Sequence, residues 1–160
     1  MPMSLHYPSR SRRSGVCSIV VSLFFVGLLF STASGAGPLH DAAETGNLAQ
    51  IQRLLADGAE VSEVDSRGIW PLLAAVTTGN TAAVELLLRL KADPNQTDRY
   101  QYSALHEAAS LGYYDVVKVL VSAHARINLR DVSGITPLGY ALRSSSPETA
   151  ALLQDMGGIQ

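Results

Sequence analysis

A period of 33 residues is the feature of this sequence that most limits how the chain can fold. When the sequence is shifted by that distance, leucine falls on leucine, alanine on alanine, glycine on glycine and aspartate on aspartate. These positions are Leu39, Leu72, Leu105, Leu138, Ala42, Ala75, Ala108, Ala141, Gly46, Gly79, Gly112, Asp65, Asp98 and Asp131. A period of this length, built from a helix pair and a turn, predicts a solenoid whose units stack on one another.

The repeated stretches resemble the core motif of the ankyrin-repeat family. PLHDAAETGN, WPLLAAVTTGN, SALHEAASLGY and TPLGYALRSSS resemble T-P-L-H-x-A-A-x-x-G, and GAEVS, KADPN and HARIN resemble the G-A-x-x-N that ends a unit. The four copies keep register from residue 37 to about residue 158 without an insertion. The resemblance implies an all-α solenoid of four helix-pair units with hairpin-like turns, at residues 37–69, 70–102, 103–135 and 136–160.

Local signals predict where helices begin and end within a unit. Pro38 suits the first helical position, where the missing backbone N–H costs nothing. A second helix is expected over residues 48–56 after the capping residue Asn47, and the last helix is expected to end at Asp155. Lys91 replaces the glycine that follows a helix in the family, and a positive φ there would cost about 1 kcal/mol.

The first 36 residues differ from the repeats and have the composition of a secretory signal peptide. Residues 1–15 carry three arginines and no acidic residue, residues 16–30 carry no charge, and residues 31–36 are small. An apolar core of 15 residues is shorter than the roughly 20 that span a bilayer. We therefore expect cleavage, at one of three positions: after Ala33, Gly35 or Ala36. An uncleaved membrane anchor is the alternative.

Charge and cysteine content favour an exported protein that binds no nucleic acid. The chain after residue 15 has nine basic and fourteen acidic residues, a formal charge of −5, whereas nucleic acid favours clustered Lys and Arg. The single cysteine, Cys17, lies in the apolar core, so a cleaved chain has no disulfide. A cysteine-free exported chain suits a bacterial periplasm. We expect a periplasmic protein, or one anchored in the inner membrane if the segment is retained.

The repeats lack the motifs of catalysis, cofactor binding and metal binding, and we expect no enzyme activity, no cofactor and no metal. His40 and His106 lie 66 residues apart at the histidine position of the family motif. Catalysis would need a nucleophile or carboxylate that converges on them. We favour the structural role that the resemblance implies, a hydrogen bond between a helix start and the adjacent turn.

A protein partner is expected on the concave face that turns and first helices form in the family. Carried onto this sequence, that face holds the turn tips Ser66, Arg67, Arg99, Tyr100, Val132 and Ser133, and the helix positions Asp41, Glu44, Ala74, Thr77, Glu107, Ser110, Tyr140 and Arg143. The chain is expected to act there as a monomeric interaction module, or as a membrane-anchored scaffold if the first segment is retained. Export onward to a host cell is a third reading that no particular residue favours.

Aromatic and arginine residues gather at two neighbouring turns, and these residue types are enriched at binding hot spots. The partner-binding residues are predicted to be Arg67, Trp70, Arg99, Tyr100, Tyr102, Glu107 and Tyr140. Aromatic packing between adjacent turns is the alternative interpretation. If these side chains are exposed and bind a partner, alanine at Trp70 and Tyr100 should abolish partner capture and leave stability unchanged.

Overall fold

The computed structural model describes residues 37–160, and the signal segment expected at residues 1–36 lies outside the described residues. Within this range the chain forms eight helices: α1 (Pro38–Glu44), α2 (Leu48–Ala56), α3 (Pro71–Thr77), α4 (Thr81–Arg89), α5 (Ala104–Ser110), α6 (Tyr114–Ser122), α7 (Pro137–Arg143) and α8 (Pro147–Asp155). Apart from one isolated bridge between Thr97 and Ser103, residues 37–160 contain no strand. The predicted all-α class is confirmed for this range, as are the second-helix bounds 48–56 and the end at Asp155.

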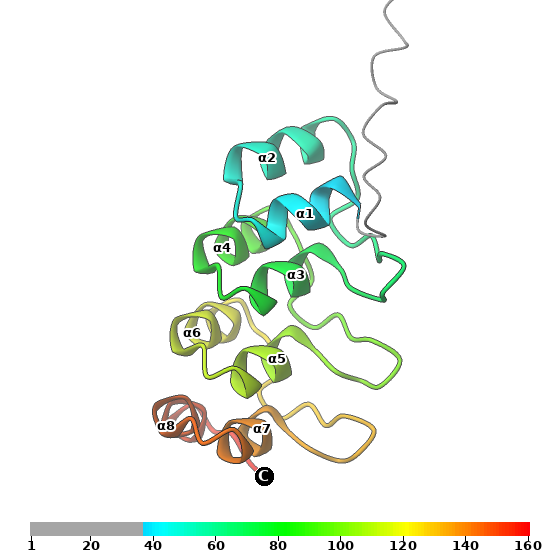
Figure 1. Cartoon of the computed structure of the whole chain (residues 1–160). Helices are drawn as coiled ribbons and strands as arrows, with labels where there is room; N and C mark the ends of the chain where they lie inside the picture. Colours follow the sequence, from blue (N-terminus) through cyan, green and yellow to red (C-terminus); the bar gives the residue numbers. More distant parts are fainter. Residues whose placement is uncertain (1–36) are drawn as a thin grey trace, which may run out of the picture. The chain divides into compact units, whose positions relative to one another are not determined.

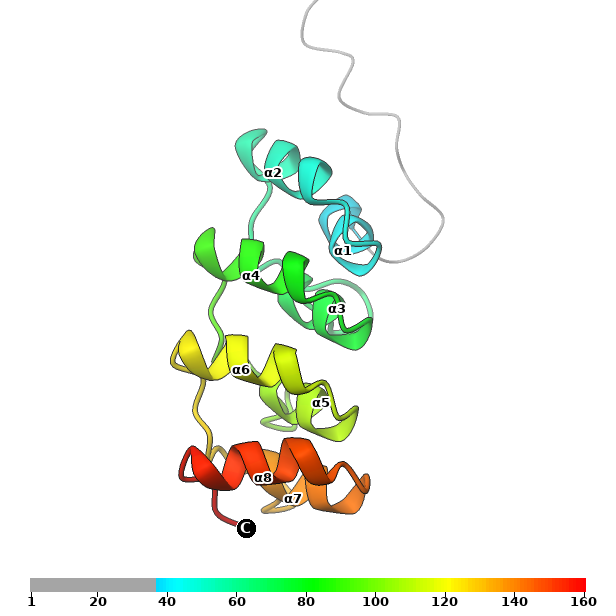
Figure 2. The same cartoon turned by 90° about the vertical axis from the view of Figure 1, so that its left-hand side faces the viewer.

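The helices form two layers that run the length of the stack (Figure 1). The first helices of the pairs, α1, α3, α5 and α7, contact one another in sequence, and α2, α4, α6 and α8 do the same. Figure 2 shows the second layer in front of the first, with each pair joined by a short connection. No helix within residues 37–160 is long and apolar enough to cross a membrane.

The leucines and alanines of the period form the core between the layers. Leu39, Leu72, Leu105 and Leu138 are all buried, and so are the alanines three residues after them. Alanine lets successive first helices approach closely, and the leucines fill the space that remains. The sequence pattern and the core therefore have the same cause, because each helix pair buries its apolar face only against a neighbouring pair.

Glycine between the paired helices makes room for the next unit. Gly79 has φ of +69°, and a Cβ there would lie 3.0 Å from the ring of Tyr113 in the following unit. Gly46 and Gly112 also have positive φ and are covered in the same way by Asn80 and Ser146. Tyr113 therefore packs against the preceding unit and has a structural role.

The asparagine that ends a unit ties it to the next unit. The side chain of Asn95 accepts the N–H of Arg126 at 2.8 Å and donates to the carbonyl of His124 at 3.2 Å. Asn128, one period later, holds Ile159 and Gly157 in the same manner, at 2.8 and 3.0 Å. The last residues of the chain thus take the place that a loop of the next unit occupies elsewhere.

Candidate functional site

Three tight turns project from the first-helix layer, and an aspartate organises each of them (Figure 1). In the first turn, Oδ1 of Asp65 accepts the N–H of Arg67 at 2.8 Å and that of Ile69 at 2.9 Å. Burial opposes ionisation of Asp65, but these bonds and the Arg67 guanidinium outweigh it and lower the pKa of the carboxyl. Asp98 and Asp131 cap the second and third turns through the same backbone positions.

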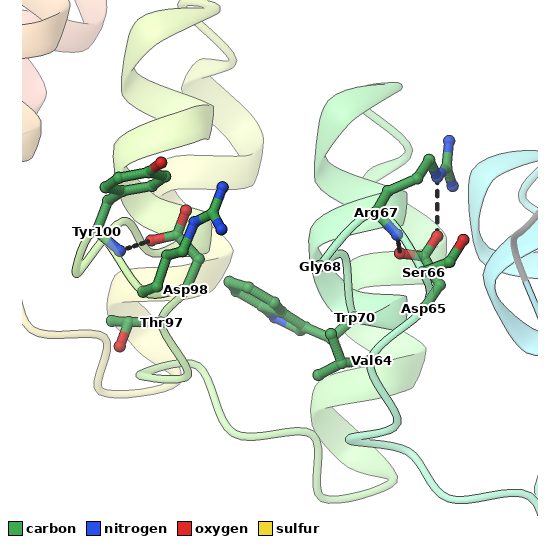
Figure 3. A pocket seen from close by; sticks show the side chains of 10 residues that line it. Val64, Asp65, Ser66, Arg67, Gly68, Trp70, Thr97, Asp98 and Tyr100 are labelled. Carbon is green, nitrogen blue, oxygen red and sulfur yellow. Dashed lines mark hydrogen bonds and ion pairs between the residues drawn. The ribbon is translucent and has the colours of Figure 1, made fainter.

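The three turns are not joined alike, because one backbone hydrogen bond joins the second turn to the third. The N–H of Val132 donates to the carbonyl oxygen of Tyr100 at 3.0 Å. The positions one period earlier are Arg99 and Arg67, and the described backbone makes no such bond between them. Instead the indole of Trp70 extends from the start of α3 between the first and second turns (Figure 3).

A cavity of about 550 Å³ lies between these two turns. It is lined by Val64, Asp65, Ser66, Arg67, Gly68, Trp70, Thr97, Asp98, Arg99 and Tyr100. We call it the inter-turn cavity. The structure therefore brings together four of the seven predicted partner-binding residues, Arg67, Trp70, Arg99 and Tyr100, around one hollow.

The exposed members of this group are the two arginines and the tyrosine. Tyr100 is 51% exposed, and the guanidinium of Arg99 lies 4.8 Å from the centre of its ring. Arg67 donates through Nε to Oδ2 of Asp65 at 2.8 Å, and this bond raises the pKa of the guanidinium. The arginines of both turns are thus charged side chains at the surface, each held beside a residue of its own turn.

Trp70 was predicted to be a partner-binding residue, but only 2% of its surface is exposed. The indole packs as part of the core, so the packing interpretation holds for this residue and the idea that alanine would leave stability unchanged does not fit. Its Nε1 is buried and has no hydrogen-bond partner among the described residues. Trp70 forms the floor of the inter-turn cavity and offers little surface of its own.

Tyr102, Glu107 and Tyr140 lie together in a second group, on the first-helix layer. The hydroxyl of Tyr102 donates to Glu107 Oε2 at 2.8 Å, and that of Tyr140 donates to Asp131 Oδ2 at 2.6 Å. The bond to Asp131 and burial raise the pKa of Tyr140 to about 12, and burial with the Glu107 bond raises the pKa of Tyr102. The two rings meet edge to face, with centroids 5.4 Å apart. These predicted binding residues are half-buried and engaged with neighbouring side chains.

His106 has the predicted structural role. Its Nδ1 accepts the N–H of Ser103 at 3.1 Å, so the proton is on Nε2, which lies 3.1 Å from the carbonyl of Leu129 and 3.3 Å from that of Ile135. These carbonyls precede and follow the third turn. Burial lowers the pKa of His106, because the ring is enclosed and already satisfied as the neutral form.

His40 makes the corresponding bonds with Nε2, 3.0 Å from the carbonyls of both Glu63 and Ile69. Its Nδ1 is buried without a partner among the described residues, because Gly37 stands where the third unit has Ser103. A Cβ at Gly37 would lie 3.1 Å from Nδ1, which places a serine hydroxyl within reach. The backbone of Gly37 is extended, with φ of −71°, so serine fits its conformation.

We therefore predict that Gly37→Ser stabilises the protein by about 1 kcal/mol, because the hydroxyl satisfies a buried acceptor and improves the helix cap. Urea unfolding followed by circular dichroism measures the change. Gly37→Ala is the matched control, since it adds the Cβ without the hydroxyl, and it should give no gain. Equal stability of the serine and alanine variants would contradict this assignment.

The remaining positions expected on the concave face are not all available to a partner. Ala74 is buried, whereas Glu44 and Arg143 are exposed and Thr77 and Ser110 are half-buried. Residues 37–160 hold no group of three or more His, Asp or Glu side chains placed to bind a metal ion. The sequence signal missed Gln101, which adopts φ of +61° at the turn position where the other two turns have glycine.

Comparison with known proteins agrees with the repeat architecture. A family model described as "Ankyrin repeats (3 copies)" matches residues 39–131. Inversin from Gallus gallus is 35% identical over 126 residues, which are 78% of this chain and 11% of that protein. Protein phosphatase 1 regulatory subunit 12A from Mus musculus is 40% identical over 53 residues, which are 33% of this chain and 5% of that protein. The chain thus spans about a tenth or less of the length of these relatives.

Proposed function

Because the chain belongs to the ankyrin-repeat family, we propose that it is a non-catalytic protein-interaction module that acts outside the cytosol. Ankyrin repeats suggest protein–protein interaction, and the second relative is by its name a regulatory subunit of another protein. The observation that carries the proposal is the group of exposed side chains at the inter-turn cavity, Arg67, Arg99 and Tyr100. Exposed tyrosine and arginine beside a hollow are typical of residues that anchor a partner.

The test is partner capture by a variant that leaves the frame intact. Tyr100→Ala removes a half-exposed ring from a turn tip, and we expect capture of the native partner from a periplasmic extract to be lost. Tyr114→Ala is the matched control, because Tyr114 is 41% exposed and also carries a cation on its ring, Lys118 at 5.6 Å, but lies on α6. Capture that survives both substitutions would mean that the turns are not the binding face.

The proposed location outside the cytosol rests on residues 1–36 alone. A basic segment, an uncharged core of 15 residues and a small-residue tail support export to a periplasm. Intact mass of the exported protein gives the outcome, with a first residue at 34, 36 or 37 expected after cleavage. A mass that includes residues 16–30 would favour the membrane-anchored scaffold. Sedimentation of the same sample tests the expectation of a monomer.

A further inference from the structure

The gap between the first two turns is a place where the pattern of the repeat is interrupted. Val132 N–H to Tyr100 C=O joins the later turns, whereas Arg99 N–H and Arg67 C=O, one period earlier, have no bond to each other. The indole of Trp70 lies between these turns, at the unit start where the other three units have smaller residues, Gly37, Ser103 and Thr136 (Figure 3). Three features thus coincide at this place: the large side chain of Trp70, a backbone N–H and C=O that are not bonded to each other, and a cavity of about 550 Å³.

The charged side chains that line the cavity differ in how many of their hydrogen-bonding atoms are already used by the protein itself. Oδ1 of Asp98 accepts the N–H of Tyr100 at 2.8 Å and that of Tyr102 at 2.9 Å, and Asp65 is held by its own turn and by Arg67. Both carboxylates therefore stabilise their own turns. Arg99 makes no ion pair within residues 37–160, and Arg67 uses Nε for Asp65, which leaves its terminal nitrogens for another acceptor.

We propose that the inter-turn cavity binds an extended acidic segment of the partner protein. The inference rests on the proposed function and names the chemistry of what is bound. The segment's main chain bridges Arg99 N–H and Arg67 C=O, as neighbouring strands pair in recognition by strand addition. A carboxylate of the segment accepts from the guanidinium of Arg99 and, to a smaller extent, from that of Arg67. The smaller share of Arg67 follows from its bond to Asp65 and from the nearby charges of Glu44 and Asp41.

The floor of the cavity supplies a built-in reporter. Trp70 is the only tryptophan of the chain and lines the cavity. Its emission should change when a segment occupies the cavity and should not respond to binding elsewhere on the stack. Trp70 itself is left unchanged in every variant of the test, because its indole belongs to the core.

The experiment selects displayed random heptapeptides on the purified protein and titrates the recovered peptides against Trp70 fluorescence. We expect enrichment of Asp and Glu, a saturable change in emission, and affinity that falls with added salt. Arg99→Gln should weaken binding about tenfold or more, since a charge-assisted bond is lost, and Arg67→Gln should weaken it less. Lys118→Gln is the control on α6 and should leave the affinity unchanged.

The outcomes separate this inference from the proposed function. Peptides that change Trp70 emission but show no acidic enrichment, and bind the Arg99→Gln variant equally well, overturn the acidic segment and leave the turns as a binding face. Peptides that leave Trp70 emission unchanged overturn the cavity as the site. If no peptide is recovered and Tyr100→Ala also keeps the native partner, both the inference and the proposed binding face are wrong.

Discussion

Replacing Trp70 by alanine is expected to lower the free energy of unfolding by about 3–5 kcal/mol. The indole is 2% exposed and lies between two turns at the start of α3, so its removal opens a large cavity in the core. Urea unfolding followed by circular dichroism measures the loss, since the variant has no tryptophan to report.

Two controls define what the indole contributes. Tyr100→Ala removes an aromatic ring from a half-exposed position in the same cavity and should change stability by no more than about 0.5 kcal/mol. Trp70→Phe keeps a ring in the core and removes the buried Nε1, which has no partner among the described residues, so the loss should be well below that of alanine. If Trp70→Ala were no more costly than Tyr100→Ala, the indole would not be part of the core.

The period predicted the fold well because each repeated residue has one structural task. Leucine and alanine fill the interface, proline begins a helix, and asparagine joins neighbouring units. A departure from the pattern could also be recognised in the sequence where a residue replaces a glycine at a position with a backbone constraint. Lys91 stands in the place of a glycine, and it does adopt the positive φ, +73°, whose cost was considered at that position.

The tolerance of the last unit for serine has a physical explanation that the sequence alone did not supply. Ser145 has φ of +56°, as the glycines at the equivalent positions do. Those glycines are each covered by a side chain of the following unit, with which a Cβ would clash or make a tight contact. Within the described chain no unit follows Ser145, so only the backbone conformation opposes a side chain there.

The candidate site was harder to predict because residue type does not determine exposure. Tryptophan, tyrosine and arginine are enriched in binding surfaces, yet the aromatic members can equally pack against a neighbouring turn. The structure divides the predicted set accordingly: Arg67, Arg99 and Tyr100 are exposed, Trp70 is in the core, and Tyr102 and Tyr140 bond to carboxylates. The missing backbone hydrogen bond between Arg99 N–H and Arg67 C=O depends on how two turns are placed relative to each other, which no local sequence pattern encodes.

Replacing Leu105 by alanine is the second substitution with a large expected effect, a loss of about 2–5 kcal/mol. Leu105 is fully buried in α5, which contacts both α3 and α7. The cavity would thus weaken the interfaces on both sides of the third unit. A solenoid is stabilised mainly by such interfaces, and three or more stacked units are needed for a stable array.

For this reason Leu105→Ala should also reduce cooperativity. With the central interfaces weakened, the two ends of the stack can unfold at different denaturant concentrations, so the urea transition should broaden as its midpoint falls. Leu142→Ala is the matched control, because Leu142 is 42% exposed in α7 and its truncation leaves no buried cavity. An unchanged midpoint and slope for Leu105→Ala, equal to those of Leu142→Ala, would contradict the register in which the leucine at the third position of each unit fills the space between neighbouring helix pairs.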